Sequence, residues 1–178
     1  MGKRSNFERV PRDYYPTPIE AVEPLIDHLP QTEFDYVEPC AGDGRLIEHI
    51  YQLTDGQADC AFASDIEPQR DDIFQADALQ LDFGEAEVDF CITNPPWERK
   101  FLHAFLDHYI DMCPTWLLFD ADWAHTKQSS LLMTYCAKIV SVGRVKWFGN
   151  QSGKDNCCWY LFDKRHKEPT QFYGRLIG

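Results

Sequence analysis

Two consecutive prolines, Pro95 and Pro96, constrain the fold of this chain more than any other feature. They follow the short, mainly apolar run 88–92, whose β-branched and aromatic residues predict a buried strand. Proline fixes φ and has no amide donor, so the chain must leave this strand in a rigid, extended turn whose carbonyl groups can accept hydrogen bonds. Open α/β sheets bind ligands at the carboxyl ends of their strands, so a site is expected at the turn from Asn94 to Trp97.

This turn has the groups needed to hold an amino group attached to a flat, conjugated ring. Such a nitrogen donates two hydrogens, which the Asn94 side-chain oxygen and the Pro95 backbone carbonyl can accept. Both bonds direct the nitrogen lone pair toward an electrophile. Trp97 would then stack on the substrate, which is worth about 1–3 kcal/mol per base. The alternative is a proline-rich turn with a packed tryptophan and no catalytic role, and the rest of the chain decides between the two.

Strand-like and helix-like segments alternate along most of the chain. Expected strands cover residues 34–38, 61–65, 73–76, 88–92, 115–120, 138–148 and 156–163, and expected helices cover 18–28, 45–51, 100–112 and 129–137. The loop 149–155 should join the last two strands into an antiparallel hairpin, followed by a basic tail. We predict an α/β fold with a seven-stranded, mostly parallel sheet, flanking helices and an antiparallel C-terminal hairpin. Thr17 is expected to cap the first helix and Pro18 to be its first residue.

The length and composition of the chain indicate its domain organisation. With 178 residues, 44% of them apolar, the chain should form one catalytic domain at 13–178 after a basic arm at 1–12.

The charge of the chain is unevenly distributed. The net charge of −12 divides into +3 for residues 1–12, −18 for 13–93 and +3 for 94–178. The half after residue 93 can therefore tolerate a polyanion, whereas the acidic overall balance predicts weak, salt-sensitive binding to nucleic acid.

Cysteine usage and hydropathy indicate the compartment. The seven cysteines are odd in number and contain no Cys-x-x-Cys pair, so they fit neither a disulfide framework nor a zinc site, and no metal is expected. No apolar run approaches about 18 residues, and the polar start is not a secretory signal. We therefore expect a soluble, cytoplasmic protein that does not enter a membrane.

Two further strand ends indicate a nucleotide-like ligand. The turn 39–44 follows the strand 34–38 and begins a helix, and its glycines, Gly42 and Gly44, let the backbone approach a ligand closely. The strand 61–65 ends at Asp65, close to the roughly twenty-residue spacing at which an acid binds ribose hydroxyls in dinucleotide folds. Gly-x-Gly alone is a weak signal, and the acid at this spacing strengthens it.

Five motifs in order give the chain a family resemblance. They are Tyr14-Tyr15-Pro16-Thr17-Pro18, Glu38-Pro39-Cys40-Ala41-Gly42-Asp43-Gly44, the strand end at Asp65, Asp77-Ala78 and Asn94-Pro95-Pro96-Trp97. Together they resemble the S-adenosylmethionine-dependent amino methyltransferases of nucleic acid, especially the adenine methyltransferases, over about residues 14–163. The order is similar to that of families whose carboxylate-binding motif precedes the glycine motif. The family often has Tyr or Phe where Trp97 stands and Ser where Cys40 stands, and the larger Trp bears on which base or base context fits.

The resemblance implies a Rossmann-like methyltransferase fold, S-adenosylmethionine as cofactor and a role for each matching residue. The implied cofactor-binding residues are Tyr15, Thr17 and Pro18 at the methionine end, Glu38, Pro39, Cys40, Gly42 and Gly44 at the centre, Asp65 and Ile66 at the ribose, Asp77 and Ala78 at the adenine, and Asn94. The implied catalytic residues are Asn94, Pro95, Pro96 and Trp97. Substrate contacts are expected from Trp97, Arg99, Lys100, Trp123 and Lys154.

Several substrates stay open at this point. Adenine in DNA is the first expectation, and RNA adenine, a protein glutamine amide and a catalytically silent cofactor-binding subunit are the alternatives. A base in a duplex has to be rotated out of the stack before it can reach such a pocket. Residues 94–178 are too few for a separate target-recognition region, so we expect low sequence specificity, a single-stranded or structured substrate, or a partner protein that supplies recognition. By analogy, so compact a chain suits a phage or mobile-element methyltransferase, and the oligomeric state is open.

Overall fold

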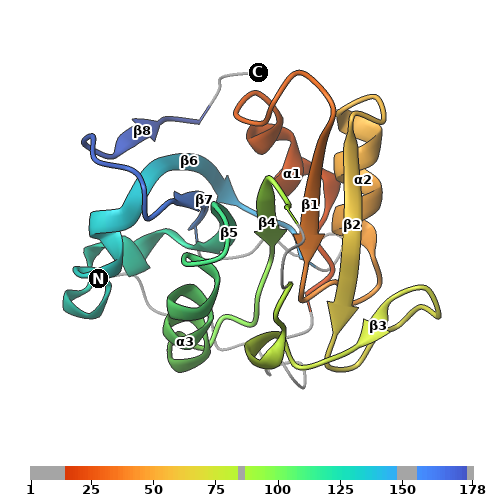
Figure 1. The fold of residues 1–178 in the computed structure, drawn as a ribbon. Helices are drawn as coiled ribbons and strands as arrows, with labels where there is room; N and C mark the ends of the chain where they lie inside the picture. Colours follow the sequence, from red (N-terminus) through yellow and green to blue (C-terminus); the bar gives the residue numbers. More distant parts are fainter. Residues whose placement is uncertain (1–14, 84–86, 148–155, 176–178) are drawn as a thin grey trace.

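An eight-stranded sheet forms the centre of the protein in this computed structural model, which describes residues 15–83, 87–147 and 156–175 (Figure 1). The strands are β1 (Phe34–Glu38), β2 (Ala58–Asp65), β3 (Phe74–Gln75), β4 (Phe90–Thr93), β5 (Thr115–Asp120), β6 (Cys136–Arg144), β7 (Asn156–Phe162) and β8 (Gln171–Tyr173). The helices are α1 (Ile19–Ile26), α2 (Arg45–Leu53) and α3 (Arg99–Tyr109), with 3-10 turns η2 (Ala78–Gln80), η3 (Ala121–His125), η4 (Lys127–Ser129) and η5 (Leu132–Tyr135).

The strand order β3-β2-β1-β4-β5-β7-β6-β8 reverses direction between β1 and β4. Strand β1 pairs in parallel with β2 on one side and with β4 on the other, because the chain moves outward to β3 and then returns across β1. Such a reversal opens a crevice beyond the carboxyl ends of the two central strands. The turn 39–44 after β1 and the turn 94–97 after β4 therefore lie on either side of one crevice.

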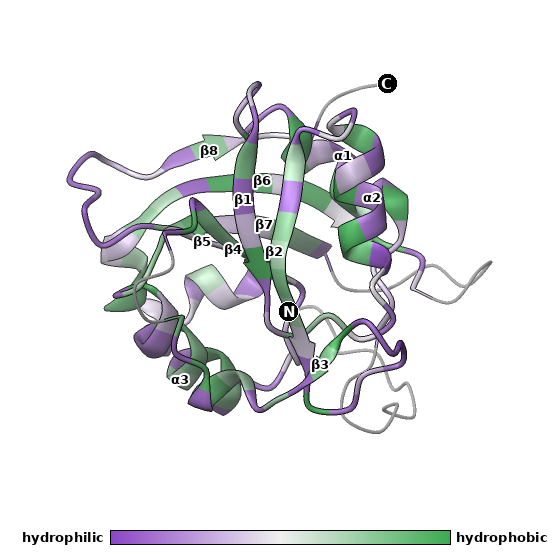
Figure 2. Cartoon of the chain, turned by 45° about the vertical axis from the view of Figure 1, so that its right-hand side comes forward, coloured by the Kyte–Doolittle hydropathy of each residue, from purple (hydrophilic) through white to green (hydrophobic). Residues whose placement is uncertain are grey.

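Apolar side chains cover both faces of the sheet. Successive strand residues point to opposite faces, so Tyr36 and Trp116 join the cluster under α1 and α2, whereas Val37 and Leu117 join the cluster under α3. All four side chains are at most 1% exposed. Strands β4 and β5 are mainly hydrophobic and many of the connecting loops are hydrophilic (Figure 2). The core is therefore two apolar layers on one sheet, the arrangement of an α/β protein.

The predicted α/β class is confirmed, with five parallel strand pairs among the described residues and β7 antiparallel to both β5 and β6. The predicted strand count of seven is wrong, because β8 adds a strand beside β6. This strand has three residues and lies in the segment expected to be a basic tail. So short an edge strand leaves no periodic pattern in the sequence.

The predicted helix at 129–137 is wrong. Ser129 is the last residue of the 3-10 turn η4, residues 132–135 form η5, and β6 already begins at Cys136. Hydroxyl side chains here bond to nearby backbone carbonyls: Thr126 to Trp123 at 2.8 Å, Ser129 to Thr126 at 2.8 Å and Ser130 to Lys127 at 2.8 Å. Such local bonds compete with helical ones and favour turns.

The start of the first helix also differs from the prediction. Helix α1 begins at Ile19, with Pro18 as an extended N-cap that makes no side-chain cap bond. Thr17 therefore does not cap the helix.

The predicted basic arm at 1–12 and the hairpin loop 149–155 lie outside the described residues. No helix in the described part of the chain is long and apolar enough to cross a membrane.

The buried indole of Trp159 connects β7 to α1, and its loss provides a stability test. Its Nε1 donates to the Ala21 carbonyl at 2.7 Å, and the side chain is fully buried. We expect Trp159→Phe to lower the free energy of unfolding by about 1–3 kcal/mol, since a buried hydrogen bond and part of a packed ring are lost. Urea denaturation measures this change. Phe172→Leu, on the 66% exposed Phe172, is the control and should stay within about 0.5 kcal/mol of the wild type.

Candidate active site

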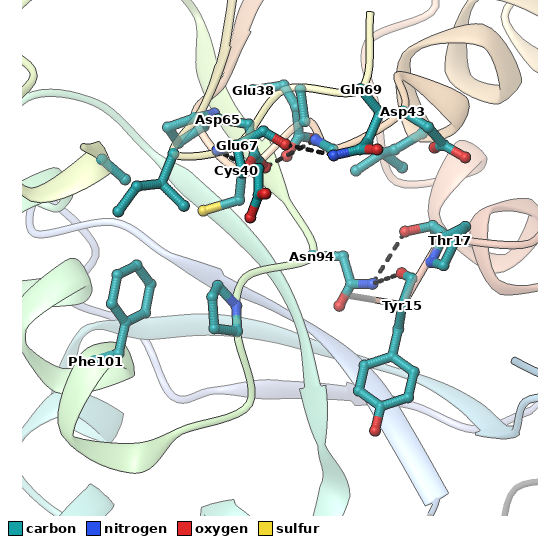
Figure 3. A pocket seen from close by; sticks show the side chains of 18 of the residues that line it. Tyr15, Thr17, Glu38, Cys40, Asp43, Asp65, Glu67, Gln69, Asn94 and Phe101 are labelled. Carbon is teal, nitrogen blue, oxygen red and sulfur yellow. Dashed lines mark hydrogen bonds between the residues drawn. The ribbon is translucent and has the colours of Figure 1, made fainter. Parts of the chain in front are cut away.

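One cavity lies at the crevice between β1 and β4 and collects most of the predicted site residues (Figure 3). The predicted residues that line it are Tyr15, Thr17, Glu38, Pro39, Cys40, Gly42, Asp65, Ile66, Asp77, Ala78, Asn94 and Pro96. They come from five separate segments, as the strand order requires. Pro16, Ala41, Asp43, Leu46, Glu67, Gln69 and Phe101 also line it and were not predicted.

The glycine turn is held to the end of β2 by the Asp65 carboxylate. One carboxylate oxygen accepts from the Gly42 backbone N–H at 2.9 Å, and the other accepts from the Glu67 N–H at 2.8 Å. Gly42 and Gly44 have φ of 55° and 79°, a region that side chains with a Cβ rarely adopt, and Gly44 is the N-cap of α2. Asp65 therefore orients two loops at once, and each oxygen keeps lone-pair capacity for a ligand hydroxyl.

Glu38 is a buried carboxyl at the centre of the cavity wall. It is 1% exposed, and its Oε1 accepts from the Thr93 hydroxyl at 2.5 Å. Burial raises the pKa of Glu38 to about 8, although hydrogen bonds from Thr93 and from the Cys40 backbone lower it. Its Oε2 has no hydrogen-bond partner within the described part of the chain. A buried, unpaired oxygen is costly, so a ligand that brings a donor or a positive charge to Glu38 would be stabilised.

The Asn94 side chain is fixed by three hydrogen bonds. Its Nδ2 donates to the Tyr15 carbonyl at 3.2 Å and to the Thr17 hydroxyl at 3.0 Å, as Figure 3 shows, and its Oδ1 accepts from the Trp97 indole at 3.1 Å. A backbone carbonyl can only accept and an indole N–H can only donate, so these partners determine which way the amide faces. The hydroxyl of Thr17 thus holds the turn 94–97 and does not cap the helix.

Trp97 lies half-buried beside the cavity without lining it. Its ring packs at 5.4 Å from the ring of Phe119 and at 5.6 Å, nearly perpendicular, from that of Trp147. Trp147 also meets the ring of Tyr15 edge-on at 5.9 Å. Aromatic side chains from β5 and from the segment after β6 thus pack on the indole, an arrangement that the sequence did not indicate.

The predicted substrate contacts fall into different environments. Trp123 is 1% exposed and packs on Phe119, Tyr160 and Phe162 in the core, so the prediction that it contacts substrate is wrong. It follows a strand end, but the turn η3 folds back over the sheet and buries it. Arg99 and Lys100 are exposed in the first turn of α3, which begins one residue after the turn 94–97. Lys154 lies outside the described residues.

Pro18, Gly44 and Pro95 were predicted in the site but do not line the cavity. Pro18 and Gly44 cap the two helices that begin beside it. Thr93 was missed, although a hydroxyl residue at the end of an apolar strand and next to Asn94 was a usable signal. Phe101 was assigned to the core by its helical spacing, yet it is half-buried and contributes to the cavity wall.

The fold is that of the Rossmann-like methyltransferases. No protein-family model matches the chain, and no curated protein matches it by sequence. A solved structure from Pyrococcus horikoshii, PH1948, described as a proposed RNA methyltransferase, is similar with a TM-score of 0.64 and 15% identity over 91% of this chain and 93% of that one.

Two other solved structures extend the comparison. The methyltransferase subunit of a type I restriction-modification system from Streptococcus thermophilus has a TM-score of 0.60 and 12% identity over 90% of this chain and 47% of that one. The chain thus spans about half the length of that subunit. A protein from Listeria monocytogenes described as a proposed class I S-adenosylmethionine-dependent methyltransferase has a TM-score of 0.55 and 13% identity, over 88% of this chain and 62% of that one.

The buried carboxyl of Glu38 gives the ligand-free protein a specific pH dependence. Its pKa of about 8 in the folded protein lies above the ordinary value of 4.5, so the folded state binds the proton more tightly than the unfolded state. This stabilisation is present below the unfolded pKa and is lost as pH rises toward 8. We expect the free energy of unfolding to fall by up to about 1.4 kcal/mol per pH unit in that window.

Glu38→Gln keeps the shape of the side chain and removes the titration, so its unfolding free energy should vary less between pH 5 and about 8, as measured by urea denaturation without ligand. Glu33→Gln, at an exposed position, is the matched control and should keep the wild-type slope. Equal slopes for Glu38→Gln and the wild type would show that Glu38 is not protonated in the folded state.

Proposed function

We propose that this protein is an S-adenosylmethionine-dependent methyltransferase that transfers a methyl group to the exocyclic amino nitrogen of adenine in DNA. The observation that carries the proposal is the rigid Asn94-Pro95 turn, whose oriented amide lies at the rim of a cavity lined by the cofactor-like motifs. The fold of known methyltransferases and the family resemblance of five ordered motifs support the same activity.

The residues of the cavity fit the proposed cofactor. The unpaired Oε2 of Glu38 suits the positive end of the methionine moiety, and the Asp65 carboxylate suits the two ribose hydroxyls. Ile66, which is 55% exposed although apolar, and the half-buried Phe101 suit the faces of an adenine ring. The Gly42 turn provides room for close backbone approach. When bound, the cofactor supplies a methyl group that its sulfonium already activates.

The chain's own contribution is to position the acceptor. The Asn94 Oδ1 and the Pro95 carbonyl accept the two amino hydrogens and hold the nitrogen with its lone pair toward the cofactor side of the crevice. Amide oxygens are weak bases, so they orient the amino group and leave proton loss to follow transfer. Burial raises the pKa of the Cys40 thiol well above its ordinary value, so this cysteine stays protonated and is not a nucleophile.

RNA adenine is the second candidate substrate. The similarity to PH1948 extends over 93% of that protein, which is described as a proposed RNA methyltransferase, so a chain of this size suits either polymer. Arg99 and Lys100 at the start of α3 are exposed beside the catalytic turn and can contact phosphates of either nucleic acid. A protein amide substrate and a silent cofactor-binding subunit are outcomes that the tests below distinguish.

Product analysis tests the substrate class. The purified chain is incubated with methyl-labelled S-adenosylmethionine and with single-stranded DNA, duplex DNA, RNA or a protein extract, and the polymers are digested for mass analysis. We expect N6-methyladenine from DNA, more from single strands, because a duplex must first release the base at a cost of a few kcal/mol. Methyladenine found only in RNA would mean that the substrate is adenine in RNA and not in DNA. Label in neither nucleic acid would overturn the proposal.

Two substitutions should separate chemistry from cofactor binding. Asn94→Ala removes an acceptor of the amino group, so we expect kcat to fall about 100-fold or more with cofactor affinity nearly unchanged. Asp65→Ala removes the ribose partner and the anchor of the Gly42 turn, so the cofactor Kd should rise about 10–100-fold. Calorimetry and single-turnover methyl transfer measure the two effects, with Asn156→Ala, at an exposed asparagine of β7, as control. Wild-type turnover by Asn94→Ala would refute the assignment.

A further inference from the structure

The Asn94 amide has nearly all of its hydrogen-bonding capacity in use. Both hydrogens of Nδ2 are donated, to the Tyr15 carbonyl and to the Thr17 hydroxyl. Of the two acceptor positions on Oδ1, one is filled by the Trp97 indole N–H at 3.1 Å. One acceptor position is left for one hydrogen of an amino group, and the proposed function assigns the other hydrogen to the Pro95 carbonyl. The orientation of that last position depends on the three bonds that are already made.

The indole of Trp97 is held in place from both sides. It packs at 5.4 Å on the Phe119 ring and at 5.6 Å on the Trp147 ring, and it contacts the apolar clusters on both faces of the sheet. If the ring left this position, it would break the bond to Asn94 and leave space beside two aromatic rings. Each of these changes costs free energy.

We infer that Trp97 is a positioning residue for the proposed methyl transfer: its indole N–H orients the Asn94 amide, and its ring stays between Phe119 and Trp147 during the reaction. This inference rests on the proposed function and changes the role that the sequence suggested for Trp97, which was stacking on the base. It also gives a chemical reason for tryptophan at this position, since phenylalanine has no donor. Acceptance by Oδ1 and donation by Nδ2 strengthen one another within a single amide.

The kinetic test replaces Trp97 by Phe, which removes the indole N–H donor and keeps an aromatic ring. For Trp97→Phe we expect kcat to fall about tenfold, with KM for the nucleic acid and the cofactor Kd within twofold of the wild type. Trp116→Phe is the matched control, because its buried indole N–H has no hydrogen-bond partner within the described part of the chain and the residue does not line the cavity, and its kcat should stay within twofold. A raised KM with unchanged kcat in Trp97→Phe would mean that the ring stacks on substrate, and it would overturn the inference.

A double-mutant cycle shows whether the effect passes through the amide. Thr17→Val removes one acceptor on the other side of the same group, so it should also lower kcat. The double variant Thr17→Val/Trp97→Phe should lose less than the product of the two single losses, because both act only by orienting Asn94. Fully multiplicative losses would indicate independent roles and contradict the inference.

The hydrogen exchange of the Trp97 indole N–H, followed by NMR on the full chain with labelled tryptophan, does not depend on turnover. We expect protection in the wild type, retained when an adenine oligonucleotide and S-adenosylhomocysteine bind, and lost in Asn94→Ala. Loss of protection on binding would show that the ring moves out, and would overturn the inference while the proposed function stands. A wild type that methylates no nucleic acid would instead overturn the proposed function, and the positioning role with it.

Discussion

The amide of Asn94 connects segments that are far apart in the chain. Its two hydrogens bind the stretch before α1 at Tyr15 and Thr17, more than seventy residues away, and its oxygen binds the indole of Trp97 three residues on. The stretch before α1, which lines the cavity, and the turn 94–97 are thus fixed relative to one another. Because a planar amide has two donors and an oxygen acceptor, a single side chain can define both positions at once.

A second link crosses the centre of the sheet at the strand reversal. The hydroxyl of Thr93, the last residue of β4, donates to the carboxyl of Glu38, the last residue of β1, at 2.5 Å. This bond lies in the buried region between the turns 39–44 and 94–97, where the surroundings favour the protonated carboxyl. A positive ligand at Glu38 would favour the charged form instead. A positive ligand would therefore change the charge of a carboxyl that is bonded to the residue next to Asn94.

Local features made several parts of the site predictable from sequence. Prolines, glycines and an acid at strand ends act through their own backbone geometry, so the turns 39–44 and 94–97 and Asp65 could be predicted to lie near one another, and residues of all three segments line the cavity. The predictions failed where the outcome depended on distant partners. Trp123 resembles an exposed residue of a loop until η3 folds over the sheet, and the segment 129–137 was read as a helix although its hydroxyl side chains bond to the local backbone.

By itself, the sequence determined the α/β class, the order of the motifs and the residue types that face the crevice, because apolar periodicity and turn chemistry are local properties. Only the tertiary structure decided how those residues are used. Helix α1 begins at Ile19, and the Thr17 hydroxyl accepts a hydrogen bond from Asn94 instead of capping the helix. The Trp97 indole donates to Asn94 and packs on Phe119 and Trp147. These roles depend on contacts between residues far apart in the chain, and such contacts exist only after the strands have been brought together in one sheet.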